Sequence, residues 1–160
     1  MTYKFETPAV FLIGPSASGK TDTAIKLAER YPFEIISVDS AMVFKDMNIG
    51  TCKPSSQNLE RIPHHLIDIL EPDAKFDAGL FINYVESAIK NIIKNNKIPL
   101  FAGGTMMFHK VLFDGIHDFP RDENLRHEIN LTKKNNGYEH LLDELKQLDP
   151  ETFQSIDVKN

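Results

Sequence analysis

The segment PAVFLIGPSASGKT, residues 8–21, joins an apolar run to a glycine-rich turn. Residues 8–13 contain β-branched and aromatic side chains and end at Gly14, which is typical of a buried parallel strand. Residues 14–21 fit the pattern G-x-x-x-x-G-K-[ST], and residues 21–30 then carry apolar side chains at helical spacing. A strand, this loop and a helix in that order predict a P-loop, which binds phosphate groups.

The residue types of this loop suit an anion. Its glycines let backbone N–H groups and the start of the helix converge on a phosphate. Lys20 can reach the terminal phosphates, and the Thr21 hydroxyl is a candidate ligand of Mg²⁺. The predicted diphosphate or nucleotide (ATP) site comprises Gly14, Pro15, Ser16, Ala17, Ser18, Gly19, Lys20 and Thr21.

Further strand and helix patterns alternate along the first two thirds of the chain. Short apolar runs at residues 34–38, 66–70 and 98–102 predict strands, and residues 78–95 carry apolar side chains along one face of a long helix. Alternating strands and helices predict an α/β fold with a parallel sheet flanked by helices. With the P-loop, the expected fold is P-loop NTPase-like.

The pattern changes to helix alone after about residue 114. From Arg121 onward only helical periodicity is present, with a turn at residues 135–137 and an N-cap followed by proline at Asp149-Pro150. We therefore expect a core domain at residues 1–114, and a helical insertion that begins near residue 115 and occupies residues 115–160.

Composition narrows the class of protein. The formal net charge of -5 gives no global attraction to nucleic acid, so an RNA partner needs a local basic groove. A single cysteine, Cys52, cannot form an internal disulfide. Nowhere do about 18 apolar residues run together, so we expect a cytoplasmic protein without a membrane segment.

Polar residues follow two of the predicted strands, where side chains of a parallel sheet reach the ligand crevice. Asp39 follows residues 34–38 and can hold magnesium indirectly, accept a proton from a substrate, or cap the next segment. Gly103-Gly104-Thr105 follows residues 98–102 and either faces the same crevice or only forms a helix cap. The alternatives stay open for each position.

For several other residues that could carry chemistry, a structural role is favoured over a functional one. His64-His65 are adjacent, so they point in different directions, and no carboxylate partner is indicated by the sequence. The Cys52 thiol is expected to be inert. Met106 and Met107 are expected to fill gaps in the core.

Two reactions are compatible with a P-loop and a downstream aspartate. In a small-molecule kinase, the loop and Mg²⁺ stabilise charge on a migrating phosphoryl group. Alternatively, the bound phosphates belong to a leaving group, and carbon is transferred. A third reading is a non-catalytic remnant that keeps the fold and an anion site.

Four motifs favour carbon transfer. In order, they are GPSASGKT, SVDSAMVFKDMNIGTCKP (residues 37–54), PHHLID (residues 63–68) and PLFAGGTMMFHKVLFDG (residues 99–115). Together they resemble the tRNA dimethylallyltransferase family, also called IPP transferases, over residues 9–115 and more loosely to residue 160. The resemblance implies transfer of a dimethylallyl group from dimethylallyl diphosphate to the N6 amine of the adenosine beside the tRNA anticodon. Diphosphate is released.

The resemblance also implies roles for particular residues. Residues 16–21 would cradle the diphosphate, with Lys20 and, through Mg²⁺, Thr21 taking its charge. Asp39 matches the general base, and Thr105 helps to position the reacting centre. The tRNA partner, through its anticodon stem-loop, would meet a segment containing Ser37, Asp39, Ser40, Ala41 and Met42.

The sequence also departs from the family. Phe44 stands in place of a usual tyrosine, Cys52 in place of an alanine, and His109 in place of an aromatic or apolar residue. Family members, whose full-length form is expected to be monomeric, are roughly twice as long. We therefore expect a truncated N-terminal portion that binds diphosphate weakly and has little or no transferase activity alone.

Overall fold

The computed structural model describes residues 7–116 and 122–157. Arg121 and Asn160, which bound the predicted helical pattern, lie outside the described residues. The chain forms two compact units, Met1–His117 and Asp118–Asn160. No helix in the described ranges is both long and apolar enough to cross a bilayer.

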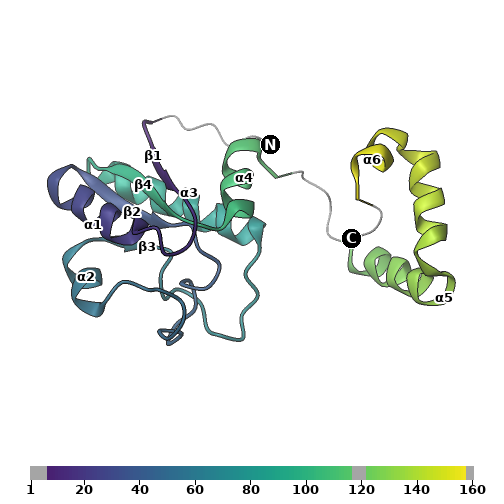
Figure 1. Cartoon of the computed structure of the whole chain (residues 1–160), viewed down its shortest axis with the longest axis horizontal. Coiled ribbons are helices and arrows are strands. Elements are labelled where there is room, and N and C mark those ends of the chain that lie inside the picture. Colours follow the sequence, from purple (N-terminus) through teal and green to yellow (C-terminus); the bar gives the residue numbers. More distant parts are fainter. Residues whose placement is uncertain (1–6, 117–121, 158–160) are drawn as a thin grey trace. The chain divides into compact units, whose positions relative to one another are not determined.

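The first unit is built on a parallel sheet, as the sequence predicts (Figure 1). Its strands are β1 (Val10–Ile13), β2 (Phe33–Ser37), β3 (His64–His65) and β4 (Ile98–Gly103), in the order β1-β4-β2-β3. β4 therefore lies between the strand that leads into the P-loop and the strand that leads to Asp39. This order brings the two predicted halves of the site to one edge.

The strand predicted at residues 66–70 is wrong. The strand is instead the shorter β3, which pairs with β2. Leu66 and Asp68 have positive φ angles of 63° and 54°, a left-handed conformation that an extended strand cannot contain. Leu70 forms only an isolated bridge with Phe44. The apolar run is therefore a turning segment that packs against the loop after β2.

Alternate side chains of the sheet build two core layers. Ile35 and Leu100 pair across β2 and β4 and pack with Ala24 and Ile25 of helix α1 (Lys20–Arg30). Their neighbours Ile36 and Phe101 point to the other face and join a larger cluster. Helices thus cover both faces of the sheet, which explains why β2 and β4 read as continuous apolar runs.

The larger cluster is formed by helices α3 (Ala78–Lys94) and α4 (Met106–Asp114). The Phe81 and Phe108 rings of these helices stack with centroids 4.3 Å apart, and both side chains are fully buried. The Asp77 side chain accepts a hydrogen bond from Leu80 N at 3.0 Å and so begins α3. A short helix, α2 (Ser56–Arg61), precedes β3.

The prediction that Met106 and Met107 fill the core is wrong. Their exposed fractions are 61% and 54%, whereas Phe108 and Leu112 of the same helix are buried. The first turn of α4 therefore turns its methionines outward, and the core face of the helix begins at Phe108.

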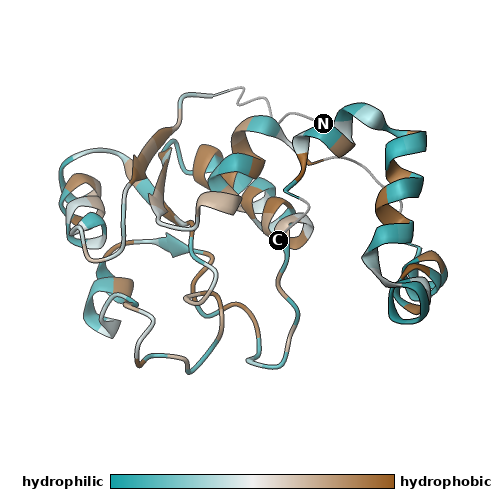
Figure 2. Cartoon of the chain, turned by 45° about the vertical axis from the view of Figure 1, so that its right-hand side comes forward, coloured by the Kyte–Doolittle hydropathy of each residue, from teal (hydrophilic) through white to brown (hydrophobic). Residues whose placement is uncertain are grey.

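The second unit contains helices α5 (Glu123–Leu148) and α6 (Pro150–Ser155). Gly137 interrupts α5 with φ 78° and ψ -176°, which confirms the predicted break. The Asp149 side chain accepts from Thr152 N at 2.9 Å, which confirms the predicted cap. Neither helix has a buried residue, and apolar side chains such as Leu125, Tyr138 and Leu148 are exposed. Figure 2 shows hydrophobic residues interspersed with hydrophilic ones along the ribbons of these helices.

Gly103→Ala is expected to destabilise the first unit by about 1–3 kcal/mol, because an added methyl group must displace packed backbone. A Cβ at residue 103 would lie 2.1 Å from the Val38 carbonyl oxygen. Gly104→Ala is the matched control, since its Cβ would lie 3.4 Å from the nearest atom, Gly14 O. Denaturant unfolding of both variants tests this, and equal midpoints would contradict it.

Candidate functional site

Two strand ends are bonded together where the site begins. Val38 N donates to Ala102 O at 2.9 Å, and Thr105 N donates to Val38 O at 3.2 Å. Gly103 lies against the Val38 backbone at a distance that leaves no room for a side chain. The turn after β4 therefore fixes the point at which Asp39 leaves β2.

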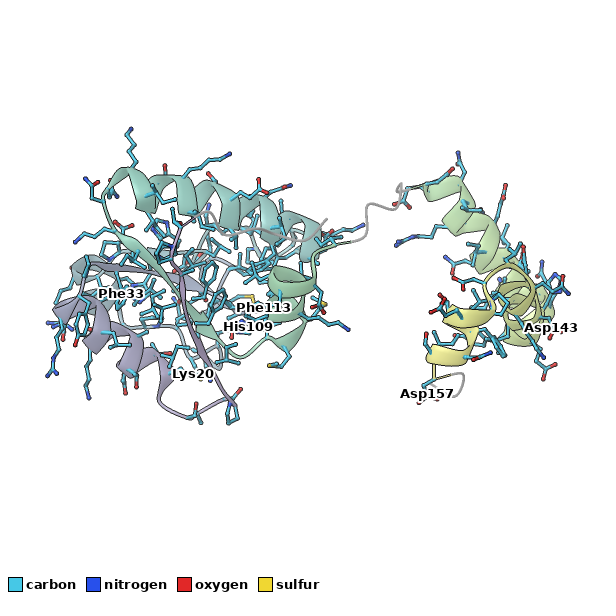
Figure 3. The ribbon with its side chains drawn as sticks, turned by 90° about the horizontal axis from the view of Figure 1, so that it is seen from above. Lys20, Phe33, His109, Phe113, Asp143 and Asp157 are labelled. Carbon is cyan, nitrogen blue, oxygen red and sulfur yellow. The ribbon has the colours of Figure 1, made fainter. Side chains whose placement is uncertain are left out.

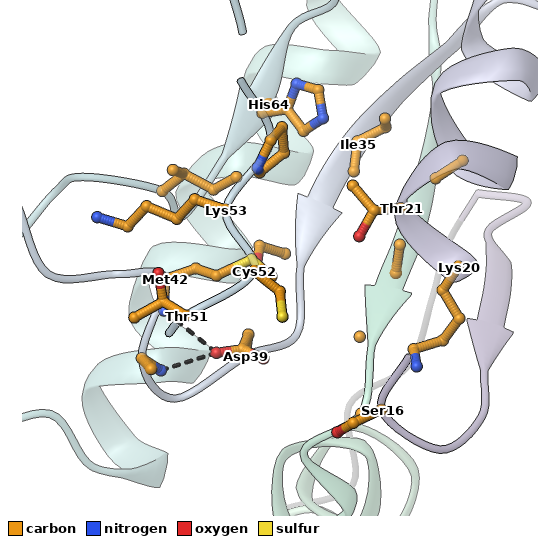
Figure 4. A pocket seen from close by; sticks show the side chains of 18 of the residues that line it. Ser16, Lys20, Thr21, Ile35, Asp39, Met42, Thr51, Cys52, Lys53 and His64 are labelled. Carbon is orange, nitrogen blue, oxygen red and sulfur yellow. Dashed lines mark hydrogen bonds between the residues drawn. The ribbon is translucent and has the colours of Figure 1, made fainter. Parts of the chain in front are cut away.

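A pocket of about 750 Å³ opens beside this junction. Figure 4 shows Lys20 and Thr21 on one side and Asp39, Met42 and Cys52 on the other. All the predicted site residues line it except Gly14 and Pro15. The predicted residues that line the pocket are Ser16, Ala17, Ser18, Gly19, Lys20, Thr21, Ser37, Asp39, Ser40, Ala41, Met42 and Thr105. The tertiary structure thus brings the predicted diphosphate and adenine segments into one cavity.

The P-loop wall has the backbone that an anion site needs. Ala17 and Gly19 have φ angles of 61° and 78°, so the chain reverses twice before α1 begins. Such reversals turn successive N–H groups toward one point. Lys20 Nζ lies 2.5 Å from Pro15 O and 3.4 Å from Ser18 Oγ. Its ammonium group is therefore held within the loop.

Asp39 both caps a turn and lines the pocket. Its Oδ1 atom accepts hydrogen bonds from Ala41 N at 2.8 Å and Met42 N at 3.1 Å (Figure 4). Among the described residues no donor contacts its second oxygen, Oδ2. The capping and pocket readings of Asp39 are therefore compatible, because one oxygen anchors the carboxylate and the other remains available for chemistry.

The hydroxyl groups of Thr105 and Ser37 differ in their hydrogen bonding. Thr105 occupies the N-cap position of α4, but its hydroxyl makes no capping bond. Ser37 is 3% exposed, and its hydroxyl donates to Met42 Sδ at 3.6 Å. Among the described residues, the Thr105 hydroxyl at the pocket therefore has no hydrogen-bond partner, whereas Ser37 also supports the Met42 side chain.

The structure gives the histidine pair a carboxylate partner that the sequence did not indicate. His65 Nε2 lies 2.8 Å from Glu34 Oε2, and Asn95 Nδ2 donates to Glu34 Oε1 at 3.0 Å. His64 Nδ1–H donates to Ile62 O at 2.7 Å. The favoured structural role fits these bonds, although His64 also lines the pocket.

Lys53 is a pocket residue that the sequence reasoning missed. Its side chain is only 3% exposed and pairs with Asp68 at 2.5 Å. The sequence feature that could have indicated Lys53 is its place in TCKP, the end of the second motif. Its partner Asp68 is 15 residues further along the chain. Spacing of that kind predicts no contact, so only the fold reveals the pair.

His109 is a buried residue of α4. It is 1% exposed, its ring stands edge-on to Phe11, and its Nε2–H donates to Gly103 O at 3.3 Å. Its Nδ1 atom has no partner among the described residues. Figure 3 labels His109 and Phe113 on α4 and Lys20 at the start of α1. Burial lowers the pKa of His109, the Gly103 bond opposes this, and the Lys20 charge lowers it further.

Acidification is expected to destabilise the first unit through His109 and His64, whose pKa values are both lowered chiefly by burial. The folded state keeps these rings neutral, whereas the unfolded chain binds protons below a pKa of about 6.5. Stability is therefore fully present above that pH and falls as the pH drops toward the folded pKa. Denaturant unfolding at neutral and mildly acidic pH measures the loss.

His109→Phe should reduce that loss, because phenylalanine fills the space without taking up a proton. His127→Phe, at an exposed position of α5, is the matched control and should leave the pH dependence unchanged. The same acid sensitivity in His109→Phe and the wild type would contradict the role of His109.

The pocket contains oxygen donors of the kind that Mg²⁺ binds. Within residues 7–116 and 122–157 no cluster of three or more His, Cys, Asp or Glu side chains could hold a metal by itself. The pocket does offer the Thr21 hydroxyl and the Asp39 carboxylate, both hard oxygen donors. Mg²⁺ commonly takes one or two protein oxygens and completes its shell with phosphate oxygens and water. The donor set therefore fits.

The parallel sheet, the P-loop and the helices on both faces define a P-loop NTPase-like α/β protein. More specifically, residues 42–160 match the family model described as IPP transferase, and the chain belongs to that family. A tRNA dimethylallyltransferase of Thiobacillus denitrificans is 45% identical over 146 residues. This alignment covers 91% of the chain but 47% of the relative.

Solved structures agree with this assignment. The full-length tRNA isopentenylpyrophosphate transferase of Bacillus halodurans is 34% identical, with a TM-score of 0.65, over 95% of this chain and 51% of that one. A eukaryotic dimethylallyltransferase acting on tRNA is 26% identical, with a TM-score of 0.81, over 93% of this chain and 37% of that one. The chain therefore spans about half the length of the curated relative, and about half or less of these structures.

Proposed function

We propose that this chain carries the diphosphate-binding and base-bearing part of a cytoplasmic tRNA dimethylallyltransferase. The reaction moves a dimethylallyl group from dimethylallyl diphosphate to the N6 amine of the adenosine beside the anticodon. One observation carries the proposal: the P-loop and the Asp39 carboxylate line the same pocket. A phosphate-binding loop opposite a carboxylate is what an allylic diphosphate and a weakly nucleophilic amine require.

In this reaction the bond between the allylic carbon and the diphosphate oxygen breaks, and a bond from N6 to that carbon forms. The diphosphate leaves with the bonding electron pair, and the N6 proton goes to Asp39. Lys20 and the loop amides stabilise negative charge on the departing oxygen. Asp39 relieves the amine of its proton, because the lone pair of an adenine amine is delocalised into the ring.

Magnesium is proposed as the metal that accompanies the diphosphate, with the Thr21 hydroxyl as its ligand from the protein. When bound, the ion would supply positive charge to the leaving group. Thr105 is proposed to orient the reacting centre through its uncommitted hydroxyl. These roles belong to residues that line the pocket.

The acceptor base is proposed to lie against Ser37 and residues 39–42. An adenine stacked in the anticodon loop cannot reach a pocket at the edge of a sheet, so it must turn out of its stack. The net charge of -5 offers no general attraction to tRNA. We therefore propose that basic residues of the family's remaining length complete the tRNA site.

The experiment uses two proteins, this chain alone and a completed chain. The completed chain joins residues 1–160 to the part of the Thiobacillus denitrificans relative that this chain does not cover. Each is incubated with radiolabelled dimethylallyl diphosphate, Mg²⁺ and unmodified tRNA. We expect label on tRNA with the completed chain and little or none with this chain alone.

A failure of the completed chain to label tRNA would end the prenyltransferase proposal, provided that its circular dichroism shows a folded protein. A parallel incubation with radiolabelled ATP and a panel of small metabolites tests the kinase alternative. Phosphorylation of a metabolite would favour the kinase, because a prenyltransferase releases diphosphate and transfers no phosphoryl group.

A further inference from the structure

Lys53 carries a buried positive charge beside the pocket, with an acceptor for each of its donors. Its Nζ atom lies 2.5 Å from Phe44 O, 2.5 Å from Asp68 Oδ1 and 3.4 Å from Asn48 Oδ1. An ammonium group has three N–H donors, so the loop itself satisfies all of them. A lysine committed in this way is not available to bind phosphate, although it lines the pocket.

We infer that Lys53 is a positioning residue, whose buried ammonium holds the loop that orients the Asp39 carboxylate. The inference rests on the proposed role of Asp39 as the base. Lys53 touches neither Asp39 nor the P-loop through any of its bonds, and Figure 4 shows its side chain extending away from Asp39. Its effect on the reaction must therefore pass through the loop.

The first link joins Lys53 to residues 42–45. Asp68 N donates to Met42 O at 3.1 Å, Ile69 N donates to Val43 O at 2.8 Å, and Lys45 N donates to Leu70 O at 2.8 Å. Lys53 bonds both partners of this contact, through Phe44 O on one segment and Asp68 on the other. It therefore clamps residues 42–45 against residues 68–70.

The second link joins this clamp to Asp39. Met42, whose carbonyl is held by Asp68 N, donates its own N–H to Asp39 Oδ1 at 3.1 Å. Ala41 N, one residue earlier, donates to the same oxygen. A shift of residues 42–45 would therefore break the bonds that fix the carboxylate in the pocket.

Burial explains why the clamp is strong. A buried ammonium group is costly unless it is paired and hydrogen-bonded, so releasing Asp68 would leave its charge uncompensated, and releasing Phe44 O would leave one of its N–H donors without an acceptor. The clamp also holds two residues in the left-handed region, Cys52 with φ 55° and Asp68 with φ 54°. Such backbones persist where the surrounding contacts fix them. Lys53 bonds Asp68 directly and is the residue that follows Cys52 in the chain.

The test is amide hydrogen exchange on the 160-residue chain. Lys53→Met should speed exchange at the Ala41, Met42 and Lys45 amides by about tenfold or more, because their local bonds open without global unfolding. Exchange at Val85 and Leu100, buried in α3 and β4, should stay unchanged. Lys45→Met is the matched control, since its ion pair with Glu71 joins exposed side chains and should contribute little.

Function supplies a second readout that mere structural support would not give. In the completed chain, Lys53→Met should lower kcat by about tenfold or more while KM for dimethylallyl diphosphate stays within about twofold. Asp68→Asn, which removes the paired charge at nearly constant size, should act in the same direction. If Lys53→Met does not fold, Asp68→Asn is measured in its place.

Unchanged exchange at Ala41 and Met42 in both variants would overturn the inference. So would a loss of inorganic pyrophosphate affinity by about tenfold in Lys53→Met, which would make Lys53 a direct ligand. Exchange does not depend on the reaction, so the two proposals fail separately. If Lys53→Met exchanges faster but Asp39→Asn is active, the positioning role of Lys53 is supported and the role of Asp39 as base is contradicted.

Discussion

Asp39→Asn is expected to lower prenyl transfer by the completed chain by about 10²–10⁴-fold, the usual contribution of a general base. Asparagine keeps an oxygen that can accept from the Ala41 and Met42 amides, so the turn should stay intact. It cannot take the N6 proton. Initial rates of label transfer to tRNA, at saturating concentrations of both substrates, measure the loss.

This substitution separates the two readings of Asp39. A role limited to capping predicts that Asp39→Asn is active and that Asp39→Ala, which loses the acceptor, is not. A role as base predicts that both are inactive, with the hydrogen exchange of Ala41 preserved only in Asp39→Asn. Full activity of Asp39→Asn would show that the carboxylate serves the fold alone.

Lys20→Met is expected to lower kcat/KM for dimethylallyl diphosphate by about 10²–10³-fold, because one charge facing the leaving group is lost. Methionine keeps much of the apolar stem, so α1 should still begin at residue 20. Lys26→Met is the matched control, since Lys26 is exposed on the same helix and does not line the pocket. Kinetics of the completed chain and calorimetry with pyrophosphate check both variants.

Equal pyrophosphate binding by wild type and Lys20→Met would place the diphosphate somewhere other than the P-loop. Equal losses in Lys20→Met and Lys26→Met would point to bulk charge instead of a specific contact. The first outcome contradicts the proposed leaving-group site, and the second contradicts its specificity.

The P-loop shows how far local sequence reaches. The apolar strand, the glycine turn and the helix were predictable within one or two residues, because each depends on the side chains of a few neighbours. The breaks at Gly137 and Asp149-Pro150 were predictable for the same reason. Four joined motifs also indicated the family, and residues 42–160 match it.

Residues 66–70 show where local sequence fails. An apolar run of five residues can be a strand or a buried turning segment. In the structure Leu66 and Asp68 have left-handed angles, and Asp68, Ile69 and Leu70 bond to residues 42 and 43 instead of to a neighbouring strand. Met106 and Met107 mislead in the same way, since their exposure depends on which face of α4 meets the sheet. Periodicity over one turn of helix cannot specify that face.

The sequence by itself determined the phosphate loop, the alternation of strands and helices around it, and the family, because these depend on neighbouring residues and on motif order. Only the tertiary structure decided that Asp39 offers one oxygen to its own turn, that His65 pairs with Glu34, and that Lys53 is buried against Asp68. The His65–Glu34 and Lys53–Asp68 contacts join residues that are 31 and 15 positions apart in the chain. Their pairing energy depends on burial, which no short stretch of sequence specifies.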